Sequence, residues 1–140
     1  MTSLETDYAQ WAAETAERIR AGRLEGVNLA ALAEEIETLG GNEPSEVESR
    51  LTQLLMHLLK WEYQPEYRRA YGEKSWRVSI RNQRIALKRA FRRSPSLRPY
   101  AEESLAELYS DAVGLAQDDT GLVGLFPKEC PYTLGPGAGR

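Results

Sequence analysis

The sequence predicts an all-α protein: a single bundle-like domain of about five helices with an ordered C-terminal strap. Apolar residues recur at intervals of three and four along most of the chain, as in amphipathic helices, and no segment alternates as a strand does. Glycine, proline and helix-capping residues separate these periodic segments. We therefore expect one helical domain over residues 1–133, followed by a disordered Gly- and Pro-rich tail over residues 134–140.

Two helices are expected between residues 7 and 41. The first covers about residues 7–21, because Trp11, Thr15 and Ile19 share one face and Gly22 is placed to end it. Asn28 is a suitable N-cap for the second helix, and Gly40–Gly41 is expected to stop it. The stripe that this second helix is expected to bury contains Leu29, Leu32, Ala33, Ile36 and Leu39.

The rest of the chain predicts three further helices and the strap. Asn42 caps a helix that runs to about Glu62 and is apolar almost all round in its second half, so it should lie at the centre. Its expected core residues are Val47, Leu51, Leu54, Leu58 and Trp61. A helix over about residues 74–93 buries Trp76, Ile80, Leu87 and Phe91, and a last helix runs from near Pro99 to about Gln117. The strap is the short apolar segment from Leu122 to Thr133.

Charge is distributed unevenly along the chain. Residues 62–100 contain eleven Lys or Arg and three Asp or Glu, whereas the remainder contains seven and eighteen. The single cysteine cannot form an internal disulfide, and the acidic N-terminus lacks the apolar core of a signal peptide, so we expect a cytoplasmic protein. No apolar run approaches the roughly 18 residues of a membrane span, so no membrane partner is expected.

Several short motifs occur in an order that resembles a known family. They are Asn28-Leu29, Ala33-Glu34-Glu35-Ile36-Glu37, Leu39-Gly40, His57-Leu58-Leu59-Lys60-Trp61, Gln64-Pro65, Ser75-Trp76, Gln83-Arg84, Ser94-Pro95-Ser96-Leu97, Phe126-Pro127 and Cys130-Pro131-Tyr132. The chain resembles the bacterial domain-of-unknown-function family 29 over nearly its whole length. The resemblance implies a small bacterial helical protein and no established activity. One departure is Gly41-Asn42-Glu43-Pro44, where members often have a basic residue followed by Ser-Glu, and it favours a sharp break between helices.

Glu35, Glu37, His57 and Arg84 are the candidate residues for a ligand or ion site. They fall on the flanks of otherwise apolar helices, where burial and neighbouring charge both act on a titratable group. The alternative is structural: a salt bridge for the carboxylates and a packed, hydrogen-bonded role for the only histidine. Without a second histidine the sequence offers no diagnostic metal spacing, and we expect neither a metal nor another cofactor.

The strongest electrostatic signal is a row of cations on the helix over residues 74–93. Like charges three or four residues apart share a face and repel mildly, so something anionic should lie opposite them. We define this basic ridge as Lys74, Arg77, Arg81, Arg84, Lys88 and Arg92, a candidate anion-binding surface. We expect Arg77, Arg81 and Arg84 to pair internally with carboxylates of the acidic helices. Beyond the ridge, Val78 and Ile85 are expected to be covered internally, or else to mark a partner surface.

These observations favour a non-enzymatic binding or protein-interaction module, whose partner is another protein or a second copy of the chain. Two alternatives stay open. A nucleic-acid-associated protein would use the basic ridge, although the net charge of −3 argues against it. A hydrolase or nuclease would use Glu35, Glu37 and His57 in an open cleft, so the sequence does not decide whether the chain is an enzyme.

Overall fold

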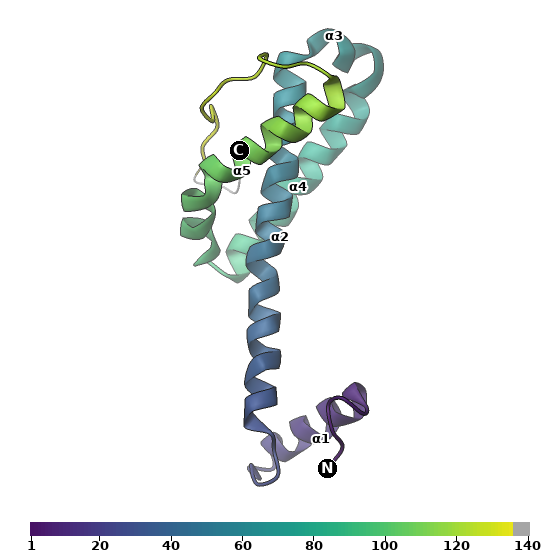
Figure 1. Cartoon of the computed structure of the whole chain (residues 1–140), viewed down its shortest axis with the longest axis vertical. Helices are drawn as coiled ribbons and strands as arrows, with labels where there is room; N and C mark the ends of the chain where they lie inside the picture. Colours follow the sequence, from purple (N-terminus) through teal and green to yellow (C-terminus); the bar gives the residue numbers. More distant parts are fainter. Residues whose placement is uncertain (136–140) are drawn as a thin grey trace. The chain divides into compact units, whose positions relative to one another are not determined.

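The computed structural model describes residues 1–135 and shows an all-α chain (Figure 1). Its four long helices are α1 (Tyr8–Arg20), α2 (Leu29–Tyr63), α4 (Glu73–Arg93) and α5 (Leu97–Thr120). Between α2 and α4 lie the short helix α3 (Pro65–Tyr67) and a π-helical segment, η1 (Arg68–Gly72). Among the described residues, no helix combines the length and apolarity needed to cross a membrane. The chain divides into an N-terminal unit, Met1–Gly41, and a C-terminal unit that begins at Asn42. The single domain expected over residues 1–133 therefore stays a prediction.

The helix α2 is continuous where the sequence predicts two helices. The expected stop at Gly40–Gly41 is wrong, and the long helices number four instead of five. Neither glycine adopts the positive φ that ends α1 at Gly22 and α5 at Gly121. Pro44 lies inside α2 and cannot donate to the carbonyl of Gly40. Gly40 is exposed, so water can satisfy that carbonyl, and the helix continues through the proline.

The N-terminal unit has a small core. The Asp7 side chain accepts a hydrogen bond from the Gln10 amide (3.0 Å) and starts α1, whose Trp11 and Thr15 are buried. Asn28 caps α2 as expected, because its side chain accepts from the Ala31 amide (3.0 Å). These contacts establish the N-terminal ends of both helices.

The buried stripe expected on the N-terminal part of α2 is wrong for most of its members, whereas Leu32 is partly buried. Leu29, Ile36 and Leu39 are 56%, 60% and 70% exposed. Within this unit α1 is the only other helix, and it meets α2 on the side of Glu35, whose carboxylate accepts from the Tyr8 hydroxyl (2.6 Å). One short helix can cover only one side of its neighbour.

The C-terminal unit contains the main hydrophobic core, where α2, α4 and α5 lie side by side (Figure 1). The predicted core stripe of α2 is confirmed for Val47, Leu51, Leu54 and Leu58, and that of α4 is confirmed in full. The expectation of full burial is wrong for Trp61, which is half-buried. Its ring instead lies under the Arg68 guanidinium, 4.5 Å from the ring centroid, because the chain turns back over it after α2.

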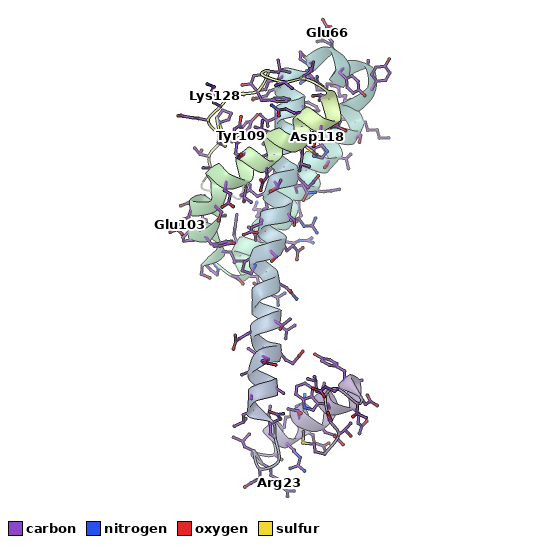
Figure 2. All side chains as sticks on the ribbon, in the orientation of Figure 1. Arg23, Glu66, Glu103, Tyr109, Asp118 and Lys128 are labelled. Carbon is purple, nitrogen blue, oxygen red and sulfur yellow. The ribbon has the colours of Figure 1, made fainter. Side chains whose placement is uncertain are left out.

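Residues after α5 run without helix or strand along the C-terminal unit. Phe126 is buried in the core. The hydroxyl of Tyr109, which is labelled on α5 in Figure 2, donates to the carbonyl of Pro127 (2.6 Å). Leu134 is partly buried, and its carbonyl accepts from Arg98 (3.2 Å). The expected disordered tail falls mostly on residues 136–140, which lie outside the described residues.

Lys60 is the only charged side chain that is buried among residues 1–135, at 7% exposure. Its ammonium donates to the Asp119 carboxylate of α5 and lies 4.7 Å from the centroid of the Trp76 ring of α4. The Trp76 ring stacks in turn on Tyr67, with the ring centroids 5.9 Å apart. One cation thus contacts both of the helices that pack against α2.

The close approach of η1 to Trp76 predicts that Gly72 cannot be enlarged. A Cβ at Gly72 would lie 2.5 Å from the Trp76 ring, which Lys60 and Tyr67 hold in place. We expect Gly72→Ala to lower the free energy of unfolding by about 1–3 kcal/mol in chemical denaturation. Gly114→Ala in α5 is the matched control, since its Cβ meets nothing within 4 Å. That change should be neutral or stabilise by up to about 1 kcal/mol. Equal effects of the two changes would contradict the packing described.

Candidate functional site

A groove of about 750 Å³ lies between the C-terminal part of α2 and α4. Apolar side chains from both helices contribute to its lining: Leu58, Trp61, Ile80 and Ile85. Four cations of the basic ridge also line it, and they are Arg77, Arg81, Arg84 and Lys88. Glu62 is the one carboxylate in the lining, and it already accepts a hydrogen bond from the Tyr132 hydroxyl (2.8 Å). We call this site the basic groove.

The six residues of the basic ridge are all exposed, and within residues 1–135 none of them forms an ion pair. Within the C-terminal unit Arg77, Arg81 and Arg84 form no ion pair, and their expected neutralisation by the acidic helices of the N-terminal unit stays a prediction. Other carboxylates of the C-terminal unit form ion pairs with other cations: Glu43 pairs with Arg93, and Asp119 pairs with Lys60. Among the described residues of this unit, no carboxylate pairs with a cation of the basic groove.

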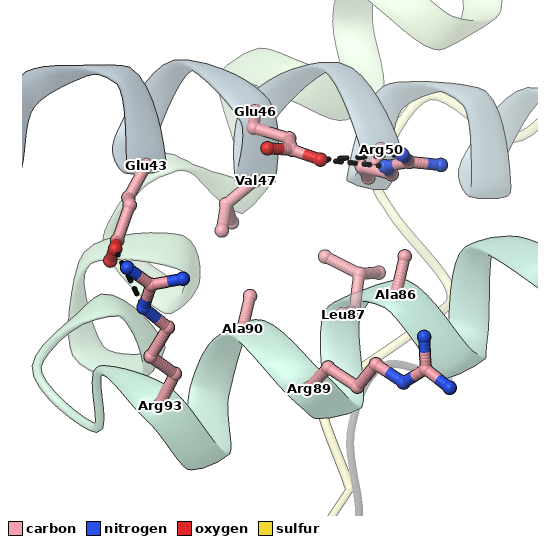
Figure 3. Close-up of a pocket in the computed structure, with 9 residues that line it drawn as sticks. All are labelled: Glu43, Glu46, Val47, Arg50, Ala86, Leu87, Arg89, Ala90 and Arg93. Carbon is pink, nitrogen blue, oxygen red and sulfur yellow. Dashed lines mark hydrogen bonds and ion pairs between the residues drawn. The ribbon is translucent and has the colours of Figure 1, made fainter. Parts of the chain in front are cut away.

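A second hollow between the same two helices provides a direct comparison (Figure 3). Its volume is about 280 Å³, and it lies between the beginning of the C-terminal unit and the end of α4. Here Glu43 pairs with Arg93 (3.2 Å) and Glu46 pairs with Arg50 (3.3 Å), as the dashed lines in Figure 3 mark. In this hollow two of the three lining cations form ion pairs with lining carboxylates, whereas within residues 1–135 none of the four cations of the basic groove forms an ion pair.

The apolar residues beyond the ridge are uncovered as well. Val78 is 48% exposed and Ile85 is 42% exposed, so the expectation of internal covering is wrong. The core takes the opposite side of α4, where Ile80, Leu87 and Phe91 are buried, and one helix cannot bury both sides against the same neighbours. The exposed part of α4 thus combines unpaired cations with accessible apolar surface.

Glu35 and Glu37 lie in the N-terminal unit. Glu35 accepts from the Tyr8 hydroxyl, and this contact together with burial raises the pKa of Tyr8. Glu37 is exposed. The other two candidates, His57 and Arg84, lie in the C-terminal unit, so the four-residue site stays a prediction. Of the four, only Arg84 lines the basic groove.

His57 is half-buried and held by its own helix. Its Nδ1 lies 2.8 Å from the Gln53 carbonyl, which can only accept, so Nδ1 carries the proton. Burial lowers the pKa of His57, and the nearby Lys60 ammonium lowers it further, whereas the contact with Gln53 opposes this. Ser79 Oγ lies 3.4 Å from the same Nδ1. Because that nitrogen is protonated, it cannot take the proton of the Ser79 hydroxyl, and the pair is not an activated nucleophile.

Cys130 is held in the segment after α5. Its Sγ donates to the Tyr132 carbonyl (3.4 Å), and burial raises the pKa of the thiol. A thiol with a raised pKa is a poor nucleophile at neutral pH. Over residues 1–135, the structure brings together no group of three or more His, Cys, Asp or Glu side chains that could hold a metal ion.

The sequence did not predict that the buried Lys60 contacts both α4 and α5, or that Trp61 lines the basic groove. The available signal was a lysine in the run Leu54–Trp61, which is apolar apart from His57 and Lys60, because a cation there must either be paired or disrupt the core.

The family model described as "Domain of unknown function DUF29" matches residues 4–136. Neither the curated proteins nor the solved structures contain a significant match to the chain.

The lowered pKa of His57 predicts how stability depends on pH. The unfolded chain binds a proton at this residue more readily than the folded chain, so folding is favoured above the ordinary pKa of 6.5 and weakened below it. We expect the wild-type chain to lose more stability between about pH 7 and pH 5 than His57→Gln, whose amide can still donate to Gln53. Urea unfolding of both chains at the two pH values measures this difference. Identical losses would show that His57 is not held neutral by the fold.

Proposed function

The chain belongs to the DUF29 family, and we propose that it is a non-enzymatic interaction module that binds an acidic protein segment in the basic groove. The observation that carries the proposal is the contrast between the two hollows of the C-terminal unit. One holds two ion pairs, and the other presents four unpaired cations beside exposed apolar surface. An occupant with carboxylates and apolar side chains would satisfy both features of the basic groove.

The apolar lining distinguishes the proposed partner from a nucleic acid. Trp61 and Ile85 offer dispersion contact to aliphatic groups, whereas a phosphate backbone needs only the cations. A helical segment with carboxylates on one side and aliphatic residues beside them fits this lining, in the manner of a helix bound in a groove. Nucleic acid is the second candidate, because the whole basic ridge is unpaired.

The proposal of a non-enzymatic role is supported by the chemistry of His57 and Glu35. Each makes a hydrogen bond that suits a structural role: His57 with Gln53 of its own helix, and Glu35 with Tyr8. The candidate nucleophiles Ser79 and Cys130 are not activated where they lie.

The C-terminal segment from Leu122 to Thr133 completes the proposed module as an ordered strap over the helices. The buried Phe126 and the hydrogen bond from Tyr109 to Pro127 support this arrangement. We also propose a bacterial cytoplasmic setting. The single cysteine, which cannot form an internal disulfide, supports the cytoplasmic part of this proposal.

Peptide titration tests the proposed function. The probe is a fluorescein-labelled helical peptide of about 20 residues with Glu on one side and Leu beside it. We expect saturable binding at low salt that weakens as salt is added. Arg81→Glu should weaken binding roughly tenfold or more, because it places a carboxylate opposite the acids of the probe. Arg89→Glu is the matched control, since it makes the same charge change on α4 outside the basic groove.

Two results would overturn the proposal. One is equal loss of binding in both variants, which would indicate a general charge effect. The other is preference for duplex or single-stranded DNA of similar length, with a steep salt dependence that Arg81→Glu removes, which would favour the nucleic-acid candidate.

A further inference from the structure

We propose that the acidic segment bound by the basic groove is helix α5 of a second copy of this chain. The inference rests on the proposed function and names its partner. It depends on a second surface of the C-terminal unit, on the exposed side of α5, that complements the groove in charge, spacing and apolar character.

The exposed side of α5 presents four carboxylates, which we call the acidic stripe: Glu103, Glu107, Asp111 and Asp118. All four are exposed, and Glu103 and Asp118 are labelled on α5 in Figure 2. At about 100° per residue they fall within a quarter-turn of one another, opposite the buried Ala112. Within residues 1–135 none of them forms an ion pair. The C-terminal unit thus contains two surfaces of opposite charge, the basic groove along α4 and the acidic stripe on α5. Within residues 1–135 the charged side chains that we assign to them on these helices form no ion pairs.

The spacing of the two surfaces matches. Arg77 and Lys88 are eleven residues apart in α4, as are Glu107 and Asp118 in α5, so each row spans about 16 Å. If the helices are antiparallel, Arg77 faces Asp118 and Lys88 faces Glu107.

The residues between those ends also correspond. In the same antiparallel register, Arg84 faces Asp111, and Arg81 faces Gly114, which has no side chain to obstruct the guanidinium. A parallel register again pairs three cations with three carboxylates and leaves Gly114 opposite Arg84. The charges therefore complement one another in either direction.

Apolar surface accompanies the charges on both helices. Leu115 is 41% exposed beside the acidic stripe, and Ile85 is accessible in the basic groove. Burying these side chains adds a stabilising contribution that salt does not screen. Each copy carries both surfaces, so one contact leaves a groove and a stripe available for a reciprocal or continuing contact.

Sedimentation velocity of charge-reversed chains tests this inference. The wild-type chain should associate as its concentration rises over a roughly hundredfold range at low salt, and added salt should weaken the association. The groove variant, Arg77→Glu with Lys88→Glu, should sediment as a monomer. The stripe variant, Glu107→Lys with Asp118→Lys, should do the same, and these four residues face one another in both registers. The control, Glu66→Lys with Glu129→Lys, reverses two exposed carboxylates outside both surfaces and should associate like the wild type.

Mixing the two variants is the decisive step. The reversed groove of one chain complements the reversed stripe of the other, and their unchanged surfaces repeat the wild-type contact, so an equimolar mixture should associate again. A single chain that carries all four changes should also associate. Recovery in both experiments excludes misfolding as the cause of the monomeric state.

Three outcomes would overturn the inference: a wild-type chain that is monomeric throughout, association that neither variant affects, or a mixture that stays monomeric. The acidic probe peptide separates this failure from that of the proposed function. If the chain is monomeric but still binds the probe in an Arg81-dependent manner, the partner is another protein and the groove retains its role. If it also fails to bind the probe, both proposals fail.

Discussion

The buried ammonium of Lys60 constrains how the C-terminal unit is built. A cation cannot leave water without compensation, and here an anion from α5 and an aromatic ring from α4 provide it. The Asp119 carboxylate is 56% exposed, so the pair avoids much of the desolvation cost of a fully buried ion pair. The helices α4 and α5 must both approach α2 at this residue. Trp76, Tyr67 and Gly72 then fit together at the turn into α4, where the ring leaves no room for a side chain at Gly72.

This arrangement determines which side of α4 is available for binding. Once Trp76, Ile80, Leu87 and Phe91 are directed into the core, the row of arginines and lysines points outward. At the start of the unit, Glu43 and Glu46 provide counter-ions for Arg93 and Arg50. Along the middle of α4, no cation of the basic groove forms an ion pair with a described residue, and the Glu62 carboxylate in the lining accepts from Tyr132. The uncompensated charge follows from the fold itself, and we propose that a partner neutralises it.

Much of the fold can be predicted from periodicity, because amphipathic stripes report which side of a helix is buried. Val47, Leu51 and Leu54 in α2 and the four core residues of α4 illustrate this. The continuation of α2 through Gly40–Gly41 and Pro44 could not be predicted, since the same residues end a helix when the glycine adopts positive φ and extend it when it does not. Leu29, Ile36 and Leu39 form a helical stripe that the N-terminal unit does not cover, because periodicity does not reveal whether a covering element exists.

The candidate site was predictable to a lesser extent. The basic ridge is visible as spacing in the sequence, yet which cations form ion pairs is revealed only by the tertiary structure, where Glu43 pairs with Arg93 and Asp119 pairs with Lys60. Likewise, the sequence identifies His57 as a titratable residue within an apolar run. Its fixed tautomer depends on the carbonyl of Gln53 one turn earlier and on the degree of burial.

A double-mutant cycle on Lys60 and Asp119 tests the central structural claim most directly. Asp119→Ala alone leaves the ammonium buried without its anion and should lower the free energy of unfolding by about 1–3 kcal/mol. Lys60→Met alone replaces the cation with an apolar side chain of similar length and should cost less. In the Lys60→Met background, Asp119→Ala should cost close to nothing, which gives a coupling energy of about 1–3 kcal/mol in urea unfolding. Effects that add to within a few tenths of a kcal/mol would contradict the claim that this contact holds the three helices together.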